Sequence, residues 1–386
     1  VTNNNVNLSI GIFTFLQMIF VAFVFAYICY FIKKKGAPRI FNILIFILFA
    51  ITPYHAMYSI TVWKDVLFAM VIPLLIIQYV NLIDDKEQFF SKKNNLILFS
   101  FTMLIAFLIR NNAIYAMIIA IPILFICYKK YWRKISLICG IPILTYLIFI
   151  KVISPSLNII GALPREALSI PLQQIAAVTV YNYDSLTDKD KEKIEKFLDL
   201  KTIKTEYDMR LSDPVKATFN NNYYLNNKQE FFSLWLDLFN RNKQIYFRAF
   251  VYNSYGYYYP ETSRYIVINN RNDEIYGIKH TPIIDNNIDE QKLIENIRNI
   301  PLISLLYSIG FMFWLNIIIA IYFVIKKKYN YLFINIMFLG LQLTLMASPV
   351  YAEFRYAYSI FTSMPILLLL MYREKVKSKE VNYVCR

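Results

Sequence analysis

The stretch SITVWKDVLFAM, residues 59–70, places a lysine and an aspartate at the start of a long apolar run. The run continues to about residue 83 and contains no further charge. An apolar segment of this length is typical of a helix that crosses the hydrocarbon core of a bilayer. Lys64 and Asp65 therefore lie at one end of a predicted transmembrane helix, where charged side chains are costly.

The chain as a whole is strongly apolar. Of its 386 residues, 57% are hydrophobic and 17% are charged, which excludes an ordinary soluble domain. The sequence lacks the alternating pattern of barrel strands, so we predict an all-α polytopic membrane protein of about nine transmembrane helices. The nine predicted spans cover residues 9–32, 40–58, 66–83, 95–109, 113–128, 135–153, 301–325, 330–348 and 359–372.

Basic residues in the short connections predict the orientation. One side holds 19 lysines and arginines, and the other side holds Lys64, Arg110 and Arg355. Since cytoplasmic connections are enriched in basic residues, the first side is cytoplasmic. Residues 1–150 then form six spans, 151–300 a largely helical extracytoplasmic segment, and 301–386 three spans with a cytoplasmic tail.

The net charge of +15 follows from the same bias. The extracytoplasmic segment has equal numbers of basic and acidic residues, so the excess belongs to the membrane part. No basic face or RNA-type aromatic motif accompanies it, and we expect no nucleic acid as a partner. The four cysteines lack metal-like spacing, and His55 and His280 are isolated, so the sequence supports no cofactor. Whether the protein requires a divalent metal is left open.

Five features are expected in the extracytoplasmic segment. A helix begins near Pro164 with Gln173 and Gln174 on its polar side, and a solvated helix over 187–200 begins at Thr187, with Asp190 completing the cap. An aromatic amphipathic helix covers 231–253, lying on the membrane or on the bundle. Residues 271–291 form an irregular loop. The tyrosine-rich stretch over 252–265 either stacks on sugar rings or packs between the loop and the bundle.

Five charged residues occupy the three short outer connections: Lys64, Asp65, Arg110, Glu353 and Arg355. The neighbouring spans 96–109 and 359–372 are about 21 Å long at 1.5 Å per residue, shorter than a core of about 30 Å. The charges then lie below the membrane surface and share one outward-facing cavity. In the alternative, Lys64 and Arg110 reach up to headgroups, and Glu353 and Arg355 pair in the interface.

This combination of charges suits a lipid-linked phosphate. Arginine offers a fork of donors to phosphate oxygens, and a carboxylate can accept a proton from an attacking hydroxyl. We assign donor-phosphate binding to Lys64, Arg110 and Arg355. Polar neighbours are assigned to substrate binding: Asn111, Asn112, Tyr257, Tyr258 and Glu261.

Several motifs carry a resemblance to known proteins. TVWKDVLFAM, FLIRNNAIYAMI, PREALSIPLQQIAAV, YNSYGYYYPE and EFRYAYSIFTSMPILLLL resemble an uncharacterised Firmicutes multispanning membrane family. That family is similar in layout to the GT-C superfamily of polyprenyl-phosphate-sugar-dependent glycosyltransferases. The resemblance implies an inverting transferase that takes a sugar from a polyprenyl-phosphate carrier and gives it to a cell-envelope polymer or lipid. It also implies a protein of the bacterial plasma membrane with an extracytoplasmic active face.

The resemblance also implies an acidic catalytic residue in the first outer loop. The sequence opens at Val1 on the polar stretch VTNNNVN, so we expect an N-terminally truncated chain in which that loop is missing or lies upstream. Asp65 is the first visible candidate for the catalytic carboxylate, and Glu353 is the second. Two alternatives stay open: a polymerase or ligase of lipid-linked glycans, and a non-enzymatic flippase or transporter.

Overall fold

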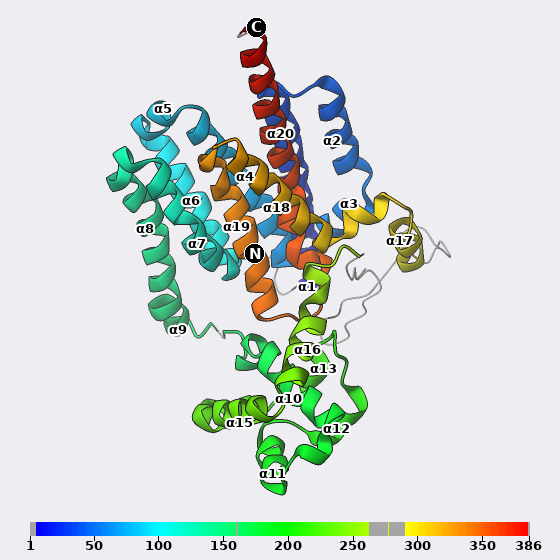
Figure 1. Ribbon diagram of the computed structural model, residues 1–386. Helices are drawn as coiled ribbons and strands as arrows, with labels where there is room; N and C mark the ends of the chain where they lie inside the picture. The colour runs from blue at the N-terminus through cyan, green and yellow to red at the C-terminus, as the bar shows by residue number, and fades with distance from the viewer. Residues whose placement is uncertain (1–4, 160, 262–276, 278–289, 385–386) are drawn as a thin grey trace.

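The computed structural model describes residues 5–159, 161–261, 277 and 290–384. Every regular element in these ranges is a helix. Figure 1 shows the apolar helices side by side in an upright bundle, with a group of shorter helices below it. The predicted all-α class is confirmed for the described residues.

Five helical stretches are long and apolar enough to cross a membrane. They are centred on α1 (Val6–Lys34), α4 (Lys64–Asp84), α8 (Trp132–Ile148), α19 (Leu332–Ala347) and α20 (Phe354–Val384). A sixth is possible where α2 (Arg39–Ile51) and α3 (Pro53–Ser59) form a pair bent by 54°. Three apolar helices are shorter: α6 (Lys93–Ile109), α7 (Asn112–Cys127) and α18 (Ile309–Ile325). The chain is therefore a multi-pass membrane protein by length and composition of its helices.

Three predicted spans differ from the helices observed. The span at 40–58 breaks at Thr52, because Pro53 begins a new helix and has no N–H to continue the old one. The span at 301–325 becomes helical only at Ile309, after a 3₁₀ turn over Ile303–Tyr307. The span at 359–372 is too short, since α20 begins at Phe354 and includes Arg355.

The α4 helix lies at the centre of the bundle. Its side chains are buried on nearly every face, including Val66, Ile72, Tyr79 and Leu82. It packs on α20 and α6, and the Thr362 hydroxyl of α20 donates a hydrogen bond to the Ala69 carbonyl over 2.7 Å. A helix buried all round is apolar all round, which is why α4 was the clearest span in the sequence.

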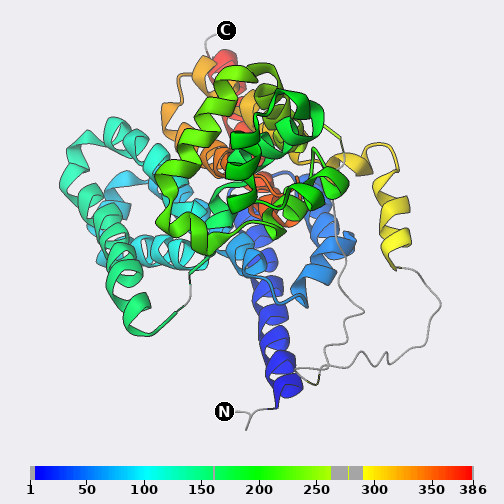
Figure 2. The same cartoon turned by 90° about the horizontal axis from the view of Figure 1, so that it is seen from below.

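Residues 164–261, which we call the helical segment, contain a hydrophobic core of their own, which includes Leu172, Phe197, Phe231 and Tyr246. The helical segment lies under the end of the bundle near α19 and α20, as the views in Figures 1 and 2 agree. Ser212 attaches it there by donating a backbone hydrogen bond to Val350 over 2.9 Å. Its helices are α10 (Ser169–Tyr181), α11 (Asp188–Phe197), α12 (Leu200–Glu206), α13 (Asp213–Ala217), α14 (Asn221–Asn226), α15 (Lys228–Arg241) and α16 (Lys243–Ser254).

Two expectations for this segment were wrong. The helix near Pro164 begins only at Ser169, after a 3₁₀ turn, and both of its glutamines are buried. The Gln173 amide donates to the carbonyls of Asp208 and Leu211 over 3.0 and 2.7 Å, so it ties a neighbouring loop to the helix. Gln174 likewise donates to the Tyr246 carbonyl over 3.2 Å. Both side chains face partners in the core rather than solvent.

The predicted helix over 231–253 is two helices that meet at Asn242. The Asn242 side chain donates to the Leu238 carbonyl and accepts a hydrogen bond from Asn182 over 2.8 Å. An asparagine that bonds locally in this way competes with the helical pattern and ends α15. The cap formed by Thr187 and Asp190 is confirmed as a reciprocal capping box. The loop predicted over 271–291 lies outside the described residues except for Gly277 and the start of α17 (Glu290–Arg298).

Candidate functional site

A buried glutamine positions the start of α4. Gln17 of α1 is 2% exposed, and its amide donates to the carbonyls of Ser59 and Thr61 over 2.8 and 2.9 Å. These carbonyls belong to the turn between α3 and α4, where a buried acceptor without a partner would destabilise the fold. The turn leads into Trp63, whose extended backbone precedes the first residue of α4. Gln17 thereby fixes the place of Lys64 and Asp65.

Asp65 forms a buried ion pair with Arg110. The Oδ1 of Asp65 lies 2.8 Å from Nη1 of Arg110, and the two side chains are 7% and 9% exposed. Arg110 immediately follows α6, so the pair joins the C-terminal end of that helix to the first turn of α4. A carboxylate in the first turn also interacts favourably with the positive end of the helix dipole.

Glu353 and Arg355 form a second pair where α20 begins. The Oε2 of Glu353 lies 2.7 Å from Nε of Arg355, with side-chain exposures of 7% and 24%. The Arg355 guanidinium carbon lies 4.5 Å from the centre of the Trp63 ring, a cation–π contact that holds the side chain against the α4 entrance. The second pair is thus adjacent to the first.

Tyr356 joins the two pairs. Its backbone carbonyl accepts a hydrogen bond from Nη1 of Arg110 over 3.0 Å, and its hydroxyl accepts one from Nη2 of Arg355 over 2.8 Å. Both guanidinium groups also lie over its ring, at 5.1 and 4.7 Å from the centre. Asp65 and Glu353 both interact electrostatically with Tyr356. We call Asp65, Arg110, Glu353, Arg355 and Tyr356 the ion cluster.

The ion cluster has no net formal charge, since two guanidinium groups face two carboxylates. Each arginine already binds an anion, as well as Tyr356. An entering phosphate must therefore share a guanidinium with a carboxylate or displace it. The predicted convergence of five charged groups is correct for four and wrong for Lys64.

Lys64 lies beside the ion cluster in the chain but points elsewhere. It is exposed, and within the described ranges it makes no ion pair with any residue. Residues 64 and 65 are consecutive in a helix, so their side chains project about 100° apart and only one can face the bundle. Asp65 takes that position because Arg110 lies opposite it.

The two predicted asparagines have different environments. Asn111 is exposed at the position before α7 and makes no side-chain cap. The Asn112 amide donates to the Thr344 hydroxyl over 3.0 Å and so links α7 to α19. Asn111 is free to contact a ligand, whereas Asn112 contributes to helix packing.

The predicted tyrosines lie against the bundle. The Tyr257 side chain is 1% exposed and its hydroxyl donates to the Tyr351 carbonyl over 3.0 Å. Burial raises the pKa of the Tyr257 phenol, and the charges of Arg110, Glu353 and Arg355 also act on it, which places it next to the ion cluster. The Tyr258 hydroxyl donates to the Val251 carbonyl over 3.1 Å. Of the two expected roles, packing is the one these contacts fit.

Glu261 lies in a small polar crevice between the helical segment and the bundle. The crevice encloses about 20 Å³. Glu261 pairs with Arg210 at 3.3 Å and accepts a hydrogen bond from the Tyr255 hydroxyl over 3.2 Å. Tyr351 and Ala352, which precede Glu353, line the same crevice. Glu261 is therefore placed on the approach to the ion cluster rather than inside it.

The residues described contain no group of three or more histidine, cysteine, aspartate or glutamate side chains that could hold a metal ion. His55 is buried, and its Nδ1 lies 2.7 Å from the Tyr358 hydroxyl. His280 lies outside the described residues. The site that the structure presents is thus built from arginines and carboxylates.

Two residues that matter for the site were missed in the sequence. Gln17 was a single amide within the apolar run 9–32, and a polar side chain in a span usually has a specific partner. Tyr356 was not among the predicted site residues. Its place between two arginines depends on the fold and has no signal in the sequence.

Comparison with known proteins assigns the chain to a family but finds no similar curated protein or solved structure. No curated protein and no solved structure is significantly similar to the chain. A family model described as a family of unknown function, DUF6020, matches residues 2–383. The match covers nearly the whole chain, and the protein belongs to this family.

Proposed function

We propose that this protein is a membrane glycosyltransferase of the GT-C type. It transfers a sugar from a polyprenyl-phosphate carrier to a cell-envelope acceptor on the outer face of the bacterial plasma membrane. In this proposal the six long spans and the three shorter apolar helices all cross the bilayer, which gives nine. The basic connections then face the cytoplasm, and the ion cluster faces outward.

The observation that carries the proposal is that four charged side chains meet at one end of the bundle and that three of them, Asp65, Arg110 and Glu353, are buried. Asp65, Arg110, Glu353 and Arg355 come from three separate segments and meet around Tyr356. Desolvating two ion pairs costs several kcal/mol per ion before their attraction is counted. Apolar residues of similar volume would hold these helices together at least as well, so a role beyond stability is favoured.

The chemistry requires one group to accept a proton and others to hold a phosphate. The acceptor hydroxyl attacks the anomeric carbon on the face opposite the phosphate, and the carbon–oxygen bond to the phosphate breaks. The bonding electrons leave with the polyprenyl phosphate, and the hydroxyl proton passes to a carboxylate. Arg110 and Arg355 stabilise the charge that develops on the leaving phosphate.

Charge balance in the ion cluster gives this scheme an order of events. While the site is empty, Asp65 is held by Arg110 and Glu353 by Arg355. A donor phosphate that binds an arginine weakens its pair and frees the carboxylate to accept a proton. Asp65 is the proposed base, and Glu353 aligns Arg355. Lys64, exposed beside them, attracts the phosphate before it enters.

Replacement of Asp65 by Asn and of Arg355 by Ala tests the proposal. Each should lower sugar transfer from a radiolabelled polyprenyl-phosphate donor in membranes by about 100-fold or more. The matched control is Arg241→Ala, which breaks the Arg241–Asp190 pair of 2.9 Å in the extracytoplasmic segment and should retain activity. Wild-type transfer by both site variants would refute the assignment.

A further inference from the structure

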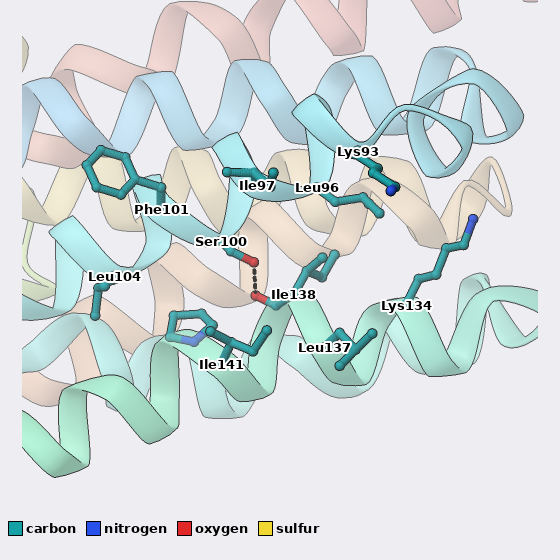
Figure 3. A pocket seen from close by; sticks show the side chains of 11 residues that line it. Lys93, Leu96, Ile97, Ser100, Phe101, Leu104, Lys134, Leu137, Ile138 and Ile141 are labelled. Carbon is teal, nitrogen blue, oxygen red and sulfur yellow. Dashed lines mark hydrogen bonds between the residues drawn. The ribbon is translucent and has the colours of Figure 1, made fainter.

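An apolar groove of about 420 Å³ runs between α6 and α8 (Figure 3). Its walls include Ile97, Phe101, Leu104, Leu137 and Ile141. The one hydroxyl group in the wall, that of Ser100, donates to the Ile138 carbonyl over 2.8 Å. The walls therefore offer hydrocarbon contacts and no free polar side chain between the two ends.

Two lysines lie at one end of this groove. Figure 3 shows Lys93 of α6 and Lys134 of α8 together at that end, away from Phe101 and Leu104. The Lys134 ammonium donates one hydrogen bond, to the Phe90 carbonyl over 2.6 Å. Neither lysine is paired with a carboxylate among the residues described. Both ammonium groups thus keep donors for an anion.

The groove has the length of one membrane leaflet. Lys93 and Leu104 are eleven positions apart on one helix, which is about 16 Å at 1.5 Å per residue. The hydrocarbon core is about 30 Å thick, so one leaflet is about 15 Å. One basic connection precedes α6 and another precedes α8, and the two lysines lie where these connections lead into the helices. Arg110 lies at the opposite end of α6.

We propose that this groove binds a phospholipid with an anionic headgroup. An acyl chain lies along the apolar walls, and the phosphate lies between Lys93 and Lys134. Clusters of basic residues at the ends of spans attract anionic lipids. A zwitterionic lipid gains less there, and a second copy of this chain would bring further lysines against these two. The site is separate from the ion cluster.

The test uses the full chain purified in detergent. Mixed micelles containing phosphatidylglycerol or phosphatidylcholine are added, and the rise in unfolding temperature is measured for each lipid. A ligand that binds the folded state raises this temperature. Phosphatidylglycerol should give the larger rise with wild-type protein. The Lys93→Gln/Lys134→Gln variant should lose at least half of that difference, and Ile141→Trp, which fills the groove, should lose a similar share.

The control variant is Lys33→Gln/Lys34→Gln, which removes two exposed lysines from the last turn of α1. It should keep the wild-type difference between the two lipids. Equal responses to both lipids, an unchanged response in the Lys93/Lys134 variant, or an equal loss in the control would overturn the proposal. A larger rise with polyprenyl phosphate that needs the same lysines, or a dimer in sedimentation that Ile141→Trp dissociates, would also overturn it.

Discussion

Asp65 and Arg110 make a 2.8 Å ion pair across the junction of α4 and α6, with both side chains almost fully buried. The pair determines which side chain at the start of α4 faces the bundle. It also leaves each partner dependent on the other, because a buried charge without a partner is strongly destabilising. This dependence can be measured.

Replacing Arg110 by Gln should lower the free energy of unfolding by about 3 to 5 kcal/mol, since Asp65 stays buried without its cation. The double variant Asp65→Asn/Arg110→Gln should lose less than the sum of the two single changes. Denaturant unfolding of purified protein provides the measurement. Lys191→Gln, in the exposed pair with Asp188, should behave as wild type. Additive single and double effects would contradict direct coupling.

Gln17 should be required for the site although it lies outside it. In Gln17→Leu, the carbonyls of Ser59 and Thr61 lose their buried donor, at about 1 to 3 kcal/mol for each unsatisfied group. We expect lower stability together with lower transfer activity, measured by thermal unfolding and by the donor assay. Thr14→Ala on the same helix removes only hydrogen bonds within α1 and should leave activity unchanged. Full activity in Gln17→Leu would contradict the prediction, because it would show that the site does not need the hydrogen bonds from Gln17 to this turn.

Two glycines in apolar helices should respond oppositely to alanine. A Cβ at Gly340 of α19 would lie 2.8 Å from the Ala116 Cα of α7, so the two helices would have to separate. We expect Gly340→Ala to lower stability by about 1 to 3 kcal/mol. Gly140 of α8 has no atom within 4 Å of its Cβ position, and Gly140→Ala should be neutral or stabilising by up to about 1 kcal/mol. Equal effects in thermal unfolding would contradict the close α7–α19 contact.

The cap of α11 should respond to acid. Burial raises the pKa of Asp190, but hydrogen bonds from Thr187 and Arg241 outweigh it and lower the pKa below its ordinary value. A carboxyl whose folded pKa is lowered stabilises the fold above its unfolded value of about 3.9 and loses that contribution as the pH falls through the folded pKa. The protection of the α11 amides, measured relative to the intrinsic exchange rate at each pH, should therefore fall below about pH 4.

Asp190→Asn is the matched variant for the α11 experiment. It removes the charge, so the protection of α11 should be lower than in wild type at neutral pH and should change little on acidification. Mass spectrometry of α11 peptides follows the exchange, and peptides of α4 serve as an internal reference. An acid response of α11 that is the same in wild type and variant would assign the effect to other carboxyl groups.

Regular elements with strong local signals were predictable. The apolar run at 66–83 corresponds to α4, and Thr187 with Asp190 forms the expected cap, because both depend on residues close in sequence. Gln173 and Gln174 were placed on the wrong side, since their partners at Asp208, Leu211 and Tyr246 come from distant segments. The start of α20 was missed because the charge of Arg355 indicated a connection, whereas contacts with Glu353, Tyr356 and Trp63 hold this side chain in the first turn of the helix.

The candidate site was predictable in its residue types and only partly in its arrangement. Asp65, Arg110, Glu353 and Arg355 were predicted as site residues because they are charged residues next to short apolar spans. Their division into two neutral pairs, and the place of Tyr356 between them, follow from the packing of α4, α6 and α20. Lys64 was included because it is adjacent in sequence, whereas the helix turns it outward.

The most direct test of the proposed function is turnover by detergent-solubilised protein with no membrane present. Purified protein is mixed with a polyprenyl-phosphate-linked radiolabelled sugar and a cell-envelope glycan acceptor, and release of polyprenyl phosphate is followed. We predict product formation by wild type and by Arg241→Ala, and a loss of about 100-fold or more in Asp65→Asn and Arg355→Ala. Binding of the donor without turnover would contradict the transferase account, as would turnover that is unchanged in both site variants.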